Sequence, residues 1–218
     1  MKTTMKITMP ESWADISLSK YLALQYDLEA YKDDREAQMN FMISHLCGID
    51  SKDILGLTQQ SYAGLQKDLF NFINDNKAEL QRFITIDGVE YGFEPNLSKM
   101  TYGAYADITR YETISVDTNW KNIMNILYRP VVAKSKGGTY EIQSYEGNTN
   151  PDKWLKVSMD KHFGCMFFFV NLSMDLLNST LNSTIQTMEV PQSYKQILER
   201  SGKIIQQSLN LQAGIFNK

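Results

Sequence analysis

The sequence is poor in the residues on which disulfide frameworks and metal sites depend. Its 218 residues include only two cysteines, Cys47 and Cys165, which lie far apart in the chain. This number excludes a disulfide framework and suits a reducing compartment. With the two histidines, His45 and His162, these cysteines are all the thiolate and imidazole ligands that the chain could offer to a metal ion.

Long apolar runs and an excess of positive charge are also missing. The longest apolar run, residues 165–170, is far shorter than the roughly 20 residues that a membrane-spanning helix needs. The first ten residues contain no apolar stretch of the kind found in secretion signals, so we expect neither export nor membrane insertion. The net charge of −3 argues against nucleic acid as a partner, because nucleic-acid-binding proteins carry a basic surface.

The patterns that would indicate an active site are absent too. His45-x-Cys47 and His162-x-x-Cys165 could together make a Cys2His2 zinc site, but neither spacing matches a zinc finger or ribbon. Buried cysteine is among the most common core residues, which is the simpler interpretation. No G-x-S-x-G accompanies the histidines, and residues 137–138 (Gly-Gly) suit a turn better than a phosphate-binding loop. We therefore expect no enzymatic activity, no cofactor and no metal.

Apolar residues at helical spacing cover most of the chain. The polar residues that precede these segments are typical helix N-caps: Ser17, Asp33 or Asp34, Ser51, Thr58, Thr101, and Thr118 or Asn119. Gly48 suits a helix C-terminus. The helix that begins near residue 119 is expected to stop at Pro130, with Arg129 in its last turn. The chain is predicted to be helical again from Trp154, with residues 163–188 at approximate helical spacing, and a final helix is predicted from about Gln192.

Two stretches favour β-hairpins instead. Residues 83–91 alternate around Asp87-Gly88, a pair that supplies the positive φ values of a type I′ turn. Residues 134–154 read as a loop or a second hairpin, turned at residues 137–138. The sequence thus predicts a mainly α protein, with one or more helical bundle-like domains and one or two short β-hairpins. Its regions would be 1–81, 82–133 and 134–218, and these could also form one continuous domain.

The chain is rich in residues typical of protein interfaces, with 12 tyrosines, 11 methionines and 3 tryptophans. The candidates for core or interface positions are Tyr102, Tyr105, Trp120, Tyr128 and Arg129. A base-stacking platform would need a series of lysine or arginine residues between the aromatic residues, and Arg110 and Lys121 are too few to supply it. The aromatic residues therefore favour a core or a subunit interface.

Three consecutive segments, FITIDGVEYGFEP, LSKMTYGAYADITRY and NWKNIMNILYRPV, resemble a recurrent arrangement in structural and assembly proteins of tailed phages. The resemblance is to crAss-like and other Bacteroidetes phages in particular. It consists of a hairpin, a Thr-aromatic-Gly-x-Tyr-x-Asp-Ile segment at residues 101–108, and a helix ending in Leu-Tyr-Arg-Pro at residues 127–130. Residues 43–49 and 54–58 are similar to segments of phage tail assembly chaperones.

The resemblance covers about residues 13–131 and implies a function. The chain would be a non-enzymatic virion structural protein, made in the host cytoplasm and placed at the head–tail junction, in the tail or inside the particle. Its partners would be other phage structural proteins, within a symmetric oligomer or a larger assembly. The alternative is a tail assembly chaperone that binds tail or tape-measure proteins before assembly.

Overall fold

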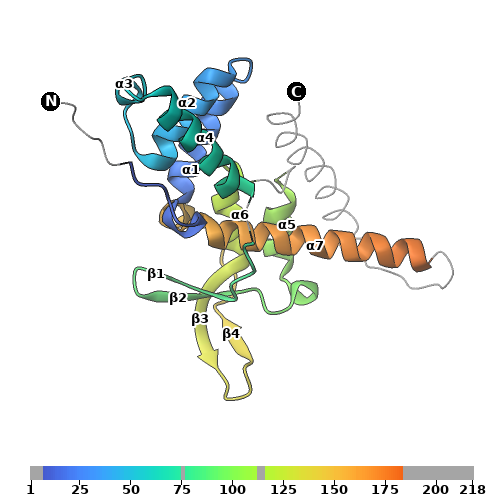
Figure 1. Ribbon diagram of the computed structural model, residues 1–218. Helices are drawn as coiled ribbons and strands as arrows, with labels where there is room; N and C mark the ends of the chain where they lie inside the picture. Colours follow the sequence, from blue (N-terminus) through green and yellow to red (C-terminus); the bar gives the residue numbers. More distant parts are fainter. Residues whose placement is uncertain (1–6, 75–76, 112–115, 184–218) are drawn as a thin grey trace. The chain divides into compact units, whose positions relative to one another are not determined.

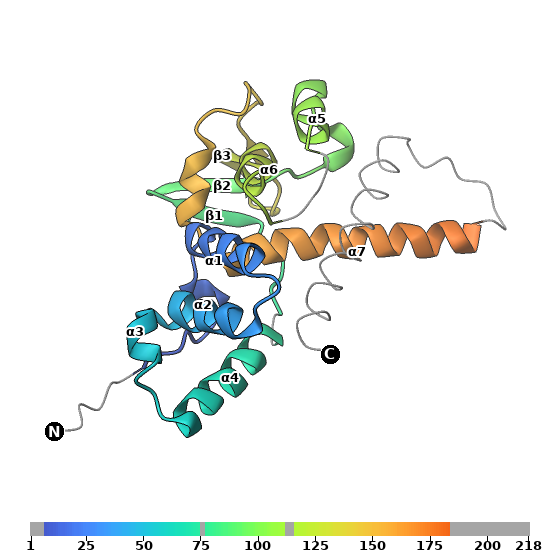
Figure 2. The same ribbon diagram turned by 90° about the horizontal axis from the view of Figure 1, so that it is seen from above.

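The computed structural model describes residues 7–74, 77–111 and 116–183. The chain divides into two compact units. The first combines Met1–Lys77 with Lys156–Asp160, and the second combines Ala78–Leu155 with Lys161–Lys218. Their helices and strands are labelled in Figure 1 and seen from above in Figure 2.

The first unit is helical. Its elements are the 3-10 helix η1 (Trp13–Asp15) and the α-helices α1 (Leu18–Ala30), α2 (Arg35–Cys47), α3 (Ser51–Ile54) and α4 (Gln59–Asn74). The Ser17 side chain accepts a hydrogen bond from the backbone N–H of Lys20, and Asp34 caps α2 in the same way. Gly48 ends α2 in the left-handed conformation at φ 69°. These three caps were predicted and are confirmed.

Apolar side chains on the inner faces of these helices form the core of the first unit, among them Leu18, Leu24, Ile43, Leu46 and Leu69. The Trp13 ring packs 4.7 Å from the ring of Phe72. A short antiparallel bridge ties the start of α1 to residues 157–159. In this bridge the Leu18 N–H donates to the Val157 carbonyl at 2.9 Å, and the Met159 N–H donates to the Ile16 carbonyl at 2.7 Å.

The second unit contains an antiparallel sheet of four strands in chain order: β1 (Phe83–Ile86), β2 (Val89–Phe93), β3 (Tyr128–Lys134) and β4 (Tyr140–Ile142). Asp87 and Gly88 join β1 to β2 with φ values of 51° and 79°, so the predicted type I′ hairpin is confirmed. Tyr91 pairs with Ile84 on one side and with Pro130 on the other.

The remaining elements are η2 (Leu97–Lys99), α5 (Tyr102–Thr109), α6 (Trp120–Leu127), η3 (Pro151–Lys156) and α7 (Met159–Ser183). Thr101 caps α5 as predicted, accepting a hydrogen bond from the Ala104 N–H. The core of the second unit gathers around α6, where Trp120, Ile123, Met124, Ile126 and Leu127 are at most 1% exposed. Aromatic rings extend this core, with Tyr128 5.4 Å and Tyr91 5.7 Å from the ring of Trp154.

The expected helical bundle is wrong, because β3 joins the two hairpins into one sheet. α6 ends at Leu127, and Tyr128 is already extended at φ −112° and ψ 121°. Arg129 therefore lies in a strand opposite Gly92, and Pro130 lies within that strand instead of stopping a helix. A residue before proline prefers the extended conformation, which favours this early end. The pairing with β2, about 37 residues away in sequence, then completes the strand.

The helical structure predicted from Trp154 is present as the end of η3 and then as α7, which begins at Met159. Residues 184–188 and the helix predicted from about Gln192 lie outside the described residues. In the part of the chain that the structure describes, no helix has both the length and the apolar character to cross a membrane.

Candidate interaction surface

The five predicted core or interface residues occupy different environments. Trp120 and Tyr128 are fully buried, and Arg129 is 9% exposed. Tyr105 is partly exposed, whereas Tyr102 at the start of α5 is 84% exposed. Tyr102 is thus the one member of this set that presents most of its side chain to a partner.

Trp120 and Tyr128 are held by hydrogen bonds inside the second unit. The indole N–H of Trp120 donates to Nδ1 of His162 at 3.2 Å. Because an indole nitrogen only donates, Nδ1 must accept, and the His162 proton resides on Nε2, which faces the Trp154 carbonyl at 3.2 Å. The Tyr128 hydroxyl donates to the Gln81 carbonyl at 2.7 Å. Burial raises the pKa of this hydroxyl.

A chain of amide groups continues this buried network toward the surface. The Trp154 indole N–H donates to Oδ1 of Asn125 at 3.2 Å. The Asn125 amide then donates to Oδ1 of Asn148 at 2.6 Å and to the Thr149 carbonyl at 3.0 Å. These bonds fix the loop before η3 against α6. The partners of a buried polar residue such as Asn125 cannot be predicted from the sequence, because they lie in a distant segment of the chain.

Tyr145 contacts two residues of the segment 101–108, which includes α5. Its hydroxyl donates to Oδ2 of Asp107 at 2.5 Å, and its ring covers Gly103, where an added Cβ would lie 3.6 Å from Cδ1. Burial, followed by the hydrogen bond and the charge of Asp107, raises the pKa of Tyr145. Tyr145 thus contacts Gly103 with its ring and Asp107 with its hydroxyl, two residues one turn apart on α5.

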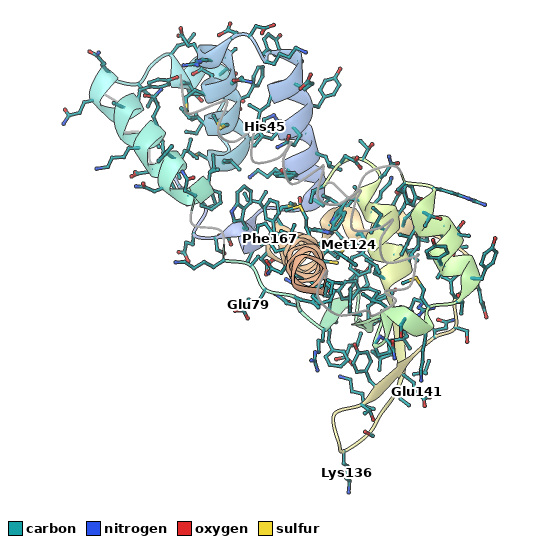
Figure 3. All side chains as sticks on the ribbon, turned by 90° about the vertical axis from the view of Figure 1, so that its right-hand side faces the viewer. His45, Glu79, Met124, Lys136, Glu141 and Phe167 are labelled. Atoms are coloured by element: carbon teal, nitrogen blue, oxygen red, sulfur yellow. The ribbon has the colours of Figure 1, made fainter. Side chains whose placement is uncertain are left out.

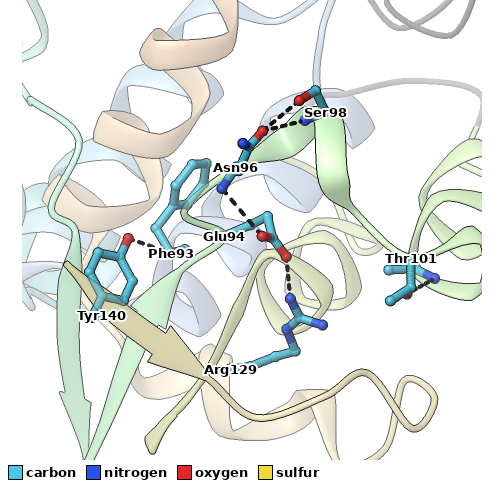
Figure 4. A network of polar contacts seen from close by, with 8 residues as sticks. Phe93, Glu94, Asn96, Ser98, Thr101, Arg129 and Tyr140 are labelled. Atoms are coloured by element: carbon cyan, nitrogen blue, oxygen red, sulfur yellow. Dashed lines mark hydrogen bonds and ion pairs between the residues drawn. The ribbon is translucent and has the colours of Figure 1, made fainter. Parts of the chain in front are cut away.

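Arg129 forms a buried ion pair with Glu94, shown in Figure 4. Both side chains are almost fully enclosed, at 11% and 8% exposure. The other Glu94 oxygen, Oε1, accepts the backbone N–H of Asn96 at 3.3 Å. Removing either partner would leave a buried charge without compensation. The arginine of the Leu-Tyr-Arg-Pro motif therefore ties β3 to the end of β2, and sequence reasoning missed its partner.

We define residues 131–142 as the hairpin arm, which comprises most of β3, the turn and β4. Its base is anchored over Gly92, where an added Cβ would lie 2.9 Å from both Tyr140 and Ile142. The absence of a side chain at Gly92 lets the Tyr140 ring lie across β2 and donate its hydroxyl proton to the Phe93 carbonyl at 2.7 Å (Figure 4). The Tyr140 ring also meets the Phe83 ring edge-on at 4.7 Å.

Lys134 strengthens the same base. Its ammonium group lies 2.7 Å from Oε2 of Glu90 and 3.8 Å from the centre of the Phe83 ring. The contacts of Tyr140 and Lys134 therefore hold both strands of the arm to β1 and β2. An isolated two-stranded hairpin is marginally stable in water, so these anchors are what keeps the arm extended.

Most of the arm is nevertheless exposed. Residues 132–139 are all exposed, including the apolar side chain of Val132 at 63%. The turn closes with a hydrogen bond from the Ser135 N–H to the Thr139 carbonyl at 2.9 Å, and Gly138 adopts φ 83°. Figure 3 shows Lys136 at the tip, pointing away from the rest of the second unit. This arm, held by Tyr140 and Lys134 and exposed over residues 132–139, is the candidate interaction surface.

The residues of the zinc hypothesis have other contacts. His45 Nε2 lies 2.7 Å from Oδ2 of Asp27, and the Cys47 thiol contacts the Met9 sulfur at 3.2 Å. Cys165 is completely buried, and burial raises the pKa of its thiol. Within residues 7–74, 77–111 and 116–183, no three His, Cys, Asp or Glu side chains gather in a way that could hold a metal ion.

A small hollow of about 260 Å³ lies between residues 78–80 and α7. Phe167 and Phe168 line one side, and Gly164 lies where the backbone of Glu79 crosses the helix. Figure 3 looks along α7 and labels Glu79 and Phe167. The lining is mainly apolar, with Glu79 as its one titratable side chain, so it lacks the paired acid and base of a hydrolytic site.

Comparison with known proteins identifies no related protein. No protein-family model matches the chain, and neither a curated protein nor a solved structure is significantly similar to it.

Proposed function

We propose that this chain is a non-enzymatic structural component of a bacteriophage virion, made in the host cytoplasm and built into the head–tail junction, the tail or the interior of the particle. The observation that carries the proposal is the hairpin arm, anchored at Tyr140 and Lys134 and exposed over residues 132–139. The phage-like motifs at residues 101–108 and 127–130 supply the reason for choosing a virion.

The arm suits insertion between other subunits. Residues 132–139 are accessible, and Val132 among them offers an exposed apolar side chain. Its base is already ordered by its own chain, so a partner would not have to supply the ordering free energy of the whole arm. Tyr102, an exposed aromatic residue of the kind enriched at interfaces, adds a second contact point on α5.

The titrating groups with shifted pKa values support a non-enzymatic role. Active sites often reveal themselves by perturbed pKa values in a cleft. Here the raised values of Tyr128 and Cys165 come from burial in the core, and that of Tyr145 comes from burial and its bond to Asp107. Each of these three shifts therefore has a packing explanation.

Mass spectrometry of gradient-purified particles tests the proposal. We expect the chain in the particles, at a fixed copy number relative to the major capsid protein. About a dozen copies would fit a portal or tail ring, and many more would fit internal cargo. Absence from particles, together with binding to tail precursors in lysates of infected cells, would reject the virion role in favour of the chaperone.

Two matched variants test the arm itself. Val132→Glu places a charge on its exposed apolar residue, and Leu55→Glu makes the same change at an 81% exposed position that follows α3. Both residues are on the surface, so each change in the free energy of unfolding should stay within about 0.5 kcal/mol. We expect Val132→Glu to reduce incorporation into particles and Leu55→Glu to leave it unchanged. Equal incorporation of both variants would show that the arm is not the contact.

A further inference from the structure

The two edges of the sheet differ in how they are protected. At β1, the Arg82 carbonyl accepts the Phe93 N–H at 2.9 Å, so in this antiparallel pair the N–H and C=O groups of Ile84 and Ile86 point toward β2. Those of Phe83 and Thr85 therefore point away from the sheet. In the part of the chain that the structure describes, no backbone hydrogen bond reaches either residue on that side.

β4, at the other edge, carries features that usually discourage strand addition. It has three residues, its pairing with β3 is irregular between Val131 and Ala133, and a charged residue, Glu141, lies at its centre. β1 has four residues, a regular register with β2 and no charged residue within it. Its sequence, Phe-Ile-Thr-Ile, consists of β-forming residues without proline or lysine, and Thr85 at its centre is exposed.

We propose that the β1 edge binds β1 of a second copy of this chain in antiparallel register, joining two four-stranded sheets. The register places Ile84 opposite Ile84 of the second copy. Phe83 then faces Thr85 of the second copy, and Thr85 faces Phe83 of the second copy. Each copy offers two N–H and two C=O groups at this edge, so the pairing makes four hydrogen bonds and leaves none of these groups unpaired.

The side chains are compatible with this register. Phe83 opposite Thr85 is an aromatic and β-branched pair, a favourable combination across strands. Arg82 faces Ile86 of the second copy and Asp87 faces Gln81, so no like charges oppose each other. The contact uses the same surface on both copies and is therefore closed at two, which favours a dimer over a fibre. This inference does not depend on where the protein lies in a particle.

Sedimentation of the full chain in reducing buffer, from micromolar to millimolar concentration, tests the dimer. Thr85→Pro removes an N–H that points away from β2, so β1 can still pair with β2 while the dimer loses two of its four hydrogen bonds. We expect its dimer dissociation constant to rise at least about tenfold. Thr85→Val keeps the N–H and the β-branched shape, and it should dimerise like the unmodified chain.

Amide hydrogen exchange on the unmodified chain gives a readout that needs no variant. The Phe83 and Thr85 amides should exchange more slowly as the concentration rises, whereas those of Ile84 and Ile86 should stay protected throughout. A chain that remains monomeric at millimolar concentration would overturn the proposal. So would a dimer that Thr85→Pro leaves intact, or a dimer whose Phe83 and Thr85 amides stay unprotected.

Discussion

Replacing Gly164 with alanine should destabilise the protein, although the same change in an exposed helix usually stabilises it. Gly164 is the sixth residue of α7, and a Cβ built there lies 2.1 Å from the Glu79 carbonyl oxygen and 2.6 Å from its carbon. Real Cβ atoms do not approach non-bonded heavy atoms closer than 3.0 Å, so the backbone at Glu79 and α7 must move apart by at least 0.9 Å, the difference between 3.0 and 2.1 Å. The obstacle is backbone and cannot rotate away.

The expected magnitude follows from two opposing effects. Forcing an extra methyl group into a packed site costs about 1–3 kcal/mol, and a backbone obstacle places this case at the upper end. Alanine is favoured over glycine inside a helix by about 1 kcal/mol. The net change for Gly164→Ala should therefore be a loss of about 2 kcal/mol in the free energy of unfolding.

Gly64 provides the matched control. It is the sixth residue of α4, and an added Cβ there meets no atom within 4 Å. Gly64→Ala should therefore stabilise the protein by about 0.5–1 kcal/mol. Urea unfolding, followed by far-UV circular dichroism and tryptophan fluorescence, measures both changes. If Gly164→Ala is as stable as the unmodified protein, or shifts its stability in the same direction as Gly64→Ala, the close approach of residue 79 to α7 is incorrect.

Three further predictions concern buried side chains. Trp120→Ala should lower the free energy of unfolding by roughly 3–5 kcal/mol because the indole is fully buried, and a loss under about 1 kcal/mol in urea unfolding would contradict that packing. Burial raises the pKa of Tyr128 above its ordinary value of 10.0, so the folded protein holds this proton more tightly than the unfolded chain does. The stabilising contribution of this proton is complete below pH 10 and is lost as the pH rises further. Above pH 10, Tyr128→Phe should therefore lose less of its free energy of unfolding in urea than the unmodified protein does. An equal loss in both proteins would contradict the role of Tyr128. Cys165 is completely buried and Cys47 only partly buried. A thiol reagent should therefore modify Cys47 first in the folded protein and both cysteines in urea. Rapid labelling of Cys165 in the folded protein would contradict its burial.

The sequence by itself determined those features that depend on neighbouring residues. A serine, aspartate or threonine that precedes apolar residues at helical spacing caps the helix through its own side chain, as Ser17, Asp34 and Thr101 do. Asp87-Gly88 closes a hairpin because these two residues tolerate positive φ values that most residues avoid. Such preferences act within a few residues, so they can be read without knowing the fold.

Only the tertiary structure decided what β3 is and which polar groups meet. Residues 128–130 continue a helical pattern, but pairing with β2 makes them a strand, because backbone hydrogen bonds to distant segments outweigh a weak local preference. The partners of Trp120 and Arg129, His162 and Glu94, are 42 and 35 residues away in the chain. No local pattern specifies a contact at that separation, so the buried network, the anchored base of the hairpin arm and the open edge of β1 became visible only once the chain was folded.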